Sequence, residues 1–127
     1  MRLNQVTLTV SDIARSIVFY QGLGLRLIVR STDRYARFVC PDGDTTFSVE
    51  RGDVPIAPST VVLYFECDDL DARVKFLRSA GYEVTEPRDE PWAWREARLK
   101  DPDGQVICLF FAGENRRNPP WRLLESL

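Results

Sequence analysis

Residues 3–10 hold apolar and polar side chains that alternate from position 5 onward, as a half-buried β-strand does. Ser11 and Asp12 follow this strand and can cap the free backbone N–H groups of a helix that begins next to them. Gly22 and Gly24 can supply the left-handed turn that ends the helix. The start of the chain therefore predicts a strand followed by one short helix.

Three strand-like runs follow the predicted helix, at residues 26–30, 34–40 and 45–50. The last two runs are separated by Pro41-Asp42-Gly43-Asp44, a sequence that favours a tight turn between antiparallel strands. This part of the chain therefore predicts the order β-α-β-β-β.

The same order returns after residues 53–59, a segment interrupted by prolines. The predicted elements are a strand at 61–67, a helix from Leu70 to a closing Gly81 with Asp68 and Asp69 as caps, and strands at 82–84, 94–100 and 106–111. The turn Asp101-Pro102-Asp103-Gly104 separates the last two strands.

Individual residues repeat along with the elements. Asp12, Ile13, Phe19 and Gly24 recur 57 positions later as Asp69, Leu70, Phe76 and Gly81. Ala36-Arg37 and Pro41-Asp42-Gly43 recur 61 positions later as Ala97-Arg98 and Pro102-Asp103-Gly104. The chain therefore contains two related halves. Because one half cannot cover both faces of its own sheet, we expect the halves to associate, within one chain or between chains.

Composition narrows the classes of function. The 127 residues are 44% hydrophobic and 28% charged, which suits one folded domain. The formal net charge is −2 without a basic stripe, so we expect no nucleic-acid partner.

The chain has no run of 18 apolar residues, and its N-terminal pattern is that of a strand rather than a signal peptide. We therefore expect no membrane partner and a cytoplasmic location. Cys40, Cys67 and Cys108 form no C-x-x-C pair and are expected to be reduced, buried thiols.

Three motifs, in this order and partly duplicated, suggest a family. They are Leu8-Thr9-Val10-Ser11-Asp12, the Phe19-Tyr20 pair before Leu23-Gly24-Leu25, and the Asp101-Pro102-Asp103-Gly104 turn. With them the sequence resembles the vicinal oxygen chelate superfamily, which includes glyoxalase I, bleomycin resistance proteins and extradiol dioxygenases. The resemblance implies an α+β fold in which two β-α-β-β-β modules form a curved mixed sheet with an open cleft and helices on the convex face.

We assign the whole chain, residues 1–127, to a single domain of this kind. Module one covers residues 1–52, a linker covers 53–59, module two covers 60–112, and a C-terminal arm covers 113–127. Pro120 excludes a long helix before it, so the arm is expected to be extended. Trp121 in the arm either docks on a partner subunit or rims the cleft, or it packs on its own domain.

The resemblance also implies where metal ligands would lie: a His near the start of each first strand and a carboxylate on each last strand. These positions fall at Gln5 and Ser48 (or Phe47) in module one, and at Val62 and Cys108 in module two. The chain contains no His, so the usual imidazole ligand is missing. We therefore expect no metal and no other cofactor. A hard-cation site built from Glu50 and Glu66 is the alternative.

Strand alternation predicts which side chains face the cleft. They are Gln5, Thr7, Thr9, Ser48 and Glu50 in module one, and Val62, Tyr64, Glu66, Cys108 and Phe110 in module two, with Trp92 and Trp94 nearby. This mixture of apolar and polar groups suits a small organic ligand that is held by buried area and oriented by a few hydrogen bonds.

Several of these candidates also have purely structural interpretations. Glu66 either contacts a ligand or forms an ion pair with Arg37 or Arg98. Trp92 and Trp94 either wall a planar ligand or pack in a core or interface. Arg37 and Arg98 either bind an anionic ligand or form salt bridges on the sheet.

Three functions are compatible with these residues. The leading one is a protein that binds a small, partly apolar organic molecule without a metal. The second is an enzyme of the lyase, isomerase or dioxygenase type, either metal-dependent or acting by acid/base chemistry, with Glu66 as its candidate catalytic carboxylate. The third is a non-catalytic partner of another protein. The resemblance further implies a homodimer.

Overall fold

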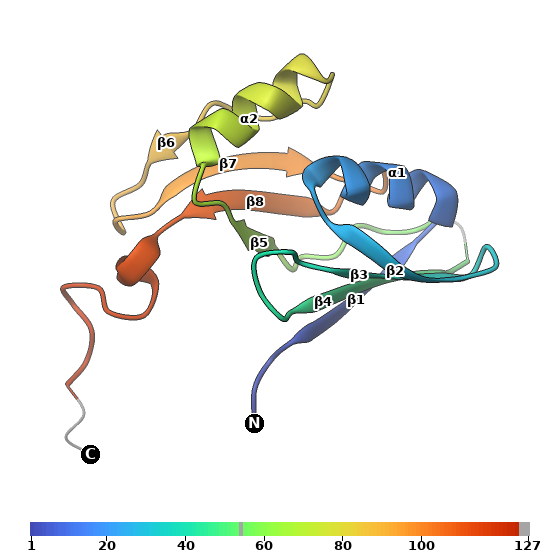
Figure 1. The fold of residues 1–127 in the computed structure, drawn as a ribbon, viewed down its shortest axis with the longest axis horizontal. Helices are drawn as coiled ribbons and strands as arrows, with labels where there is room; N and C mark the ends of the chain where they lie inside the picture. Colours follow the sequence, from blue (N-terminus) through green and yellow to red (C-terminus); the bar gives the residue numbers. More distant parts are fainter. Residues whose placement is uncertain (54, 125–127) are drawn as a thin grey trace. The chain divides into compact units, whose positions relative to one another are not determined.

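The computed structural model describes residues 1–53 and 55–124, and the chain divides into two units (Figure 1). Unit 1 comprises Met1–Thr60 together with Asp101–Gln105. Unit 2 comprises Val61–Lys100 and Val106–Leu127. Each unit contains one four-stranded mixed sheet and one α-helix, so the predicted α+β class and the repeated β-α-β-β-β order are confirmed.

The sheet of unit 1 has the strand order β1-β4-β3-β2. Its elements are β1 (Gln5–Val10), α1 (Ile13–Leu23), β2 (Arg26–Ser31), β3 (Tyr35–Val39) and β4 (Thr46–Arg51). Strand β1 pairs in parallel with β4, and the other neighbours are antiparallel. Helix α1 connects β1 to β2 at the opposite edge of the sheet, and the chain then comes back through β3 so that β4 lies beside β1 and parallel to it, which a tight hairpin could not achieve.

Helix α1 is bounded by the two signals that the sequence predicts. The carboxylate of Asp12 accepts a hydrogen bond from the backbone N–H of Arg15 at 3.1 Å, and Gly24 has the left-handed φ of 111°. Between these caps, Ile17 and Tyr20 are buried against the sheet, where the rings of Tyr20 and Phe47 lie 4.7 Å apart. The core of unit 1 is therefore the face of the sheet that α1 covers.

The turn Asp101–Gln105 belongs to unit 1 and is organised by one buried carboxylate. Asp101 accepts the hydroxyl of the fully buried Tyr20 at 2.7 Å and the backbone N–H groups of Asp103 and Gln105 at 2.9 Å each. Asp103 in turn accepts the hydroxyl of Ser11 at 2.6 Å. The acidic residues of this turn therefore form specific contacts in addition to shaping the turn.

The sheet of unit 2 has the equivalent order β5-β8-β7-β6. Its elements are β5 (Leu63–Glu66), α2 (Leu70–Ser79), β6 (Arg88–Asp89), β7 (Arg95–Lys100) and β8 (Val106–Phe111), followed by the short 3₁₀ helix η1 (Gly113–Arg116). Strand β5 is parallel to β8, as β1 is to β4. Figure 1 shows α2 on one side of this sheet, where Val74 and Leu77 are buried.

The predicted strand at residues 82–84 is wrong, and the edge strand β6 lies further along the chain. Tyr82 donates its N–H to the carbonyl of Leu77, so it still belongs to the end of α2. At Thr85 the side-chain hydroxyl, rather than a backbone carbonyl, accepts the N–H of Arg98. Pro87 has no N–H to donate to a ladder. Only Arg88 and Asp89 therefore pair regularly with β7.

Two smaller expectations are also corrected. The cap at the end of α2 is Ala80 rather than Gly81, although Gly81 does adopt a left-handed φ of 96°. The C-terminal arm was expected to be extended, but it begins with the 3₁₀ turn of η1. Trp121 beyond that turn is 58% exposed. No helix in residues 1–53 or 55–124 is long and apolar enough to cross a membrane.

Candidate functional site

Each sheet has a face that its own helix does not cover, which we call its open face. In unit 1 the open face is set by the strand register: Thr7 lies opposite Ser48, and Ser48 lies opposite Arg37. One step along the same face, Glu50 lies opposite Tyr35. The alternation predicted from the sequence therefore places Gln5, Thr7, Ser48 and Glu50 together, and the sheet adds Tyr35 and Arg37 to them.

Four of these side chains form a continuous hydrogen-bond network. The amide of Gln5 donates to the hydroxyl of Ser48 at 2.8 Å, and the hydroxyls of Ser48 and Tyr35 are 2.7 Å apart. The Nε of Arg37 donates to the Tyr35 oxygen at 2.9 Å. Ser48 is 0% exposed, so its hydroxyl needs these partners. The network connects β1, β4 and β3.

Tyr35 is the titratable group that this network changes. The hydrogen bond from Ser48 is the main cause of a lowered pKa at Tyr35, and the Arg37 guanidinium lowers the pKa further. Both partners favour the ionised form of the phenol because both can direct a hydrogen toward its oxygen. The open face of unit 1 therefore contains a hydroxyl that loses its proton more easily than an ordinary tyrosine.

The open face of unit 2 is largely aromatic. The rings of Trp94 and Phe110 are stacked with centroids 4.7 Å apart. Tyr64 meets both of them edge-on, at 5.8 Å from Trp94 and 5.6 Å from Phe110. Val62 and Trp94 pack against buried Phe110 and its neighbours Cys108 and Ala112, and Tyr64 is 47% exposed. We call Tyr64, Trp94 and Phe110 the aromatic cluster.

Beside the aromatic cluster lies a buried carboxylate that the sequence reasoning missed. Glu96 is 5% exposed, accepts the indole N–H of Trp92 at 2.6 Å and pairs with Arg98 at 3.1 Å. The thiol of Cys108 lies 3.6 Å from the same carboxylate. Burial, followed by the charge of Glu96, raises the pKa of the Cys108 thiol to about 12. Cys108 is therefore a thiol at neutral pH and a poor nucleophile.

The repeat itself could have revealed both missed residues. Tyr35 and Glu96 precede Arg37 and Arg98 by two positions, so strand alternation puts each of them on the same face as its arginine. The offset of 61 positions that relates Arg37 to Arg98 also relates Tyr35 to Glu96. Because these two residues differ in type, a search for matching residues does not find them.

Glu66 does not form the ion pair with Arg37 or Arg98 that was one of the two sequence-based alternatives. Its carboxylate accepts the backbone N–H groups of Ala112 and Gly113 at 2.8 and 2.9 Å, and its ion-pair partner is Arg116 at 3.8 Å. The expected pairing with Arg98 is wrong because Arg98 pairs with Glu96. Glu66 therefore holds the chain at the start of η1.

The positions at which the family resemblance would place metal ligands carry unsuitable donors. Ser48 and Cys108 occupy equivalent positions, each opposite its arginine, which decides the register in favour of Ser48 over Phe47. Val62 has no donor atom, and the Cys108 thiol resists ionisation. Glu66, one of the two carboxylates of the alternative hard-cation site, already accepts the backbone N–H groups of Ala112 and Gly113. No group of three or more His, Cys, Asp or Glu residues that could hold a metal ion occurs in the part of the chain that the structure describes. These residues do not fit a metal centre.

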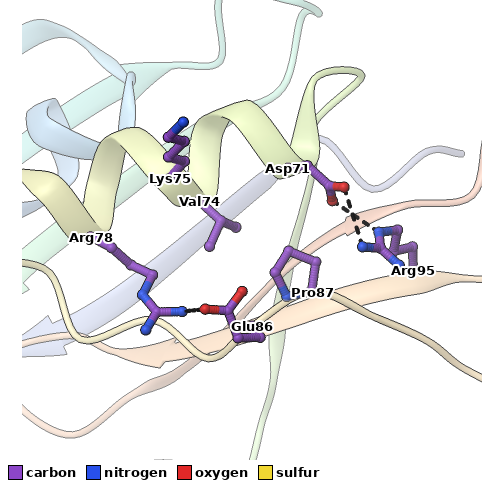
Figure 2. Close-up of a pocket in the computed structure, with 7 residues that line it drawn as sticks. All are labelled: Asp71, Val74, Lys75, Arg78, Glu86, Pro87 and Arg95. Carbon is purple, nitrogen blue, oxygen red and sulfur yellow. Dashed lines mark hydrogen bonds and ion pairs between the residues drawn. The ribbon is translucent and has the colours of Figure 1, made fainter.

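A separate pocket of about 360 Å³ lies in unit 2 beside α2 (Figure 2). It is lined by Asp71, Val74, Lys75, Arg78, Glu86, Pro87 and Arg95. Two ion pairs cross it: Arg95 contacts Asp71 at 2.9 Å, and Arg78 contacts Glu86. None of the predicted site residues lines this pocket, and most of its charges are already paired.

The two sheets, each with one covered and one open face, define an α+β protein of the glyoxalase type. A model of the Glyoxalase/Bleomycin resistance protein/Dioxygenase superfamily matches residues 2–109. The chain therefore belongs to this superfamily, as the sequence motifs predicted. No curated protein matches the sequence.

Solved structures show the same fold. Lactoylglutathione lyase from Agrobacterium tumefaciens is 16% identical with a TM-score of 0.75, covering 92% of this chain and 96% of its own. The antibiotic-binding protein TnmS3 from Streptomyces sp. CB03234 is 26% identical with a TM-score of 0.76, covering 88% and 96%. A bleomycin-binding protein complexed with bleomycin is 21% identical with a TM-score of 0.71, covering 87% and 98%.

Proposed function

We propose that this protein binds a small, partly apolar organic molecule on the open faces of its sheets and does so without a metal ion. The observation that carries the proposal is the aromatic cluster of Tyr64, Trp94 and Phe110 on the open face of unit 2. Half-exposed Tyr64 offers ring area to a planar ligand, and stacked aromatic rings bind such ligands by burying apolar surface.

Two of the similar structures support this class of ligand. TnmS3 is described as an antibiotic-binding protein, and another of the structures is a complex with bleomycin. The antibiotic bound by the first protein and the bleomycin bound by the second are organic molecules held by the same fold. For this chain the proposal is limited to the chemical class, because the side chains on the open faces determine which molecule is bound.

The proposal of a metal-free site rests on donor chemistry. The Gln5 amide donates to Ser48 at 2.8 Å, and the Gln5 carbonyl oxygen already accepts the hydroxyl of Thr46. Val62 offers no donor, and the Cys108 thiol has a pKa near 12 because of its burial and the charge of Glu96. A ligand held here is therefore bound by rings and hydrogen bonds rather than by coordination.

A metal-free acid/base enzyme is the second candidate, and one observation favours it. Tyr35 has a lowered pKa, caused first by its hydrogen bond with Ser48 and then by Arg37. A phenol that ionises more easily is a better general base near neutral pH. Conversion of a bound ligand that stops in Tyr35→Phe would favour this candidate over simple binding.

The binding proposal is tested by thermal stabilisation with a library of small aromatic compounds. A compound that binds only the folded state raises Tm. We expect Tyr64→Ala to weaken the binding of such compounds about fivefold or more, because a ring contact contributes about 1 kcal/mol. Phe76→Ala is the matched control, because Phe76 is an exposed aromatic on α2. A library without a stabilising compound, or equal effects of the two substitutions, would count against the proposal.

We also propose that the protein acts as a homodimer in the cytoplasm. Both units expose large hydrophobic side chains, among them Val18 at 70% and Trp121 at 58%, which can be covered by a second copy. Light scattering on a sizing column should give twice the chain mass of 14.6 kDa. A single-chain mass at micromolar concentration would contradict the dimer.

A further inference from the structure

We infer that Arg37 and Tyr35 form a site for an anionic oxygen group of the ligand, a carboxylate or an ionised hydroxyl. This inference rests on the binding function proposed above and names the chemical group that the open face of unit 1 recognises.

The internal repeat provides the comparison that reveals the site. Arg37 lies opposite Ser48 in unit 1, and Arg98 lies opposite Cys108 in unit 2, so the two arginines are equivalent. In unit 2 the residue two positions earlier is Glu96, whose buried carboxylate pairs with Arg98 at 3.1 Å. In unit 1 that position is Tyr35, which is neutral in its ordinary form. In unit 2 the carboxylate of Glu96 therefore neutralises Arg98, whereas in unit 1 the equivalent residue Tyr35 does not neutralise Arg37.

Among the residues that the structure describes, none supplies a counter-charge within reach of Arg37. Across residues 1–53 and 55–124, no carboxylate oxygen lies within 4.0 Å of its guanidinium nitrogens. The side chain is only partly exposed, so solvent does not screen it completely. A half-buried, unpaired guanidinium attracts an anion more strongly than a paired one.

Arg37 also keeps most of its donors available. A guanidinium has five N–H groups in a fixed planar fork, and only the Nε–H of Arg37 has a partner in the described part of the chain, the Tyr35 oxygen at 2.9 Å. The guanidinium carbon lies 5.5 Å from the centre of the Tyr35 ring, which fixes its orientation. The terminal nitrogens are therefore held in place without being used, as bidentate recognition of a carboxylate requires.

Tyr35 can supply a second donor to the same anion. The amide of Gln5 donates to the Ser48 oxygen at 2.8 Å, which leaves the Ser48 hydrogen to point at Tyr35, 2.7 Å away. With its oxygen accepting from Ser48 and Arg37, Tyr35 can direct its own hydrogen outward. Val29, opposite Arg37 on β2, offers apolar surface next to these donors for the body of the ligand.

Glu50 is the charged group that opposes the site. It lies on the same face, opposite Tyr35 in the β3–β4 ladder, and is exposed. Its charge repels an anion held by Arg37, although it does not pair with Arg37. Glu50→Gln and Arg37→Gln should therefore change the affinity for an anion in opposite directions, which a general loss of structure would not do.

The test compares benzoate with benzamide, two probes that share size and shape but differ in charge. Dissociation constants are measured on the whole protein from backbone amide shifts in NMR titrations. We expect benzoate to bind wild type at least about tenfold more tightly than benzamide, with the largest shifts at Arg37, Tyr35 and Ser48. Arg37→Gln should weaken benzoate about tenfold to a hundredfold and leave benzamide unchanged. Tyr35→Phe should weaken it less, and Glu50→Gln should strengthen it.

Arg34→Gln is the matched control, because Arg34 is exposed, precedes β3 and lies one residue out of phase with Arg37. It removes the same charge and should leave benzoate binding unchanged. Equal affinities of wild type for benzoate and benzamide, absence of benzoate binding up to about 10 mM, or equal effects of Arg37→Gln and Arg34→Gln would overturn the anion site. Binding of benzamide with equal affinity would still support the proposed binding function, so the two failures are distinguishable.

Discussion

Tyr20 and Asp101 show how a single buried contact determines local stability in unit 1. Tyr20 is fully buried and donates its hydroxyl to Asp101 at 2.7 Å. Burial, followed by the charge of Asp101, raises the pKa of Tyr20 well above its usual value. Because the pKa is higher in the folded than in the unfolded chain, this stabilising contribution is fully present below about pH 10 and is lost as the pH rises above it.

Substitution of Tyr20 by Phe should lower the free energy of unfolding by about 1–3 kcal/mol at pH 7, because Asp101 loses a buried partner. Urea denaturation of wild type and variant measures the difference. Above about pH 10 the difference should shrink, since only the wild-type unfolded chain gains an ionised tyrosine at this position. A difference that stays constant with pH would refute the assigned role of Tyr20.

At the scale of elements, the two helices occupy equivalent places in the repeat but begin differently. Asp12 caps α1 by accepting the N–H of Arg15 at 3.1 Å. Asp69 stands at the same place before α2, makes no side-chain cap hydrogen bond and lies 4.0 Å from Arg73. Sequence equivalence therefore does not guarantee an equivalent contact, since the cap also needs the right backbone angles at the capping residue.

This difference predicts unequal effects of the same substitution. Asp12→Ala should lower the free energy of unfolding by about 1 kcal/mol through loss of the cap. Asp69→Ala should lower it by less than about 0.5 kcal/mol, the contribution of an exposed ion pair. Both variants lose a negative charge near a helix N-terminus, so the larger loss in Asp12→Ala reports the cap hydrogen bond. If urea denaturation showed equal losses of unfolding free energy for the two variants, Asp12 would not be the cap of α1 that we describe.

At the scale of the whole molecule, the two units share a strand topology but carry different kinds of side chain on their open faces. On its open face unit 1 carries a polar network with Arg37, which has no ion-pair partner in residues 1–53 or 55–124, whereas unit 2 carries an aromatic cluster and an arginine paired with Glu96. The equivalent positions have diverged in residue type while the strand order is the same in both units. A repeat of this kind gives two open faces of different chemistry within one short chain.

The whole molecule should contain no stoichiometric metal. Elemental analysis of protein purified without chelator or affinity tag is expected to find divalent metal well below one equivalent, and added divalent metal should leave Tm unchanged. The reason is the absence of His and the poor donors at Gln5, Ser48, Val62 and Cys108. One equivalent of metal, lost in Glu50→Gln or Glu66→Gln, would instead favour a metal-dependent enzyme.

The sequence by itself determined the family, the class of fold and the order of most elements. These features depend on signals between neighbouring residues: alternation in strands, Asp12 and Gly24 at the ends of α1, and the Pro-Asp-Gly turns. The failed strand at residues 82–84 marks the limit of such signals. This segment does not form a strand because Thr85 and Pro87, at the edge of the sheet, do not continue the backbone ladder with β7.

Only the tertiary structure decided which polar side chains meet. Alternation placed Gln5 and Ser48 on one face, but their contact at 2.8 Å, and the links to Tyr35 and Arg37, depend on the register between β1, β4 and β3. The same holds for Glu96, which is ordinary in sequence and becomes a buried partner of Arg98 and Trp92. Register is set by the packing of the whole sheet, which residues adjacent in sequence do not specify.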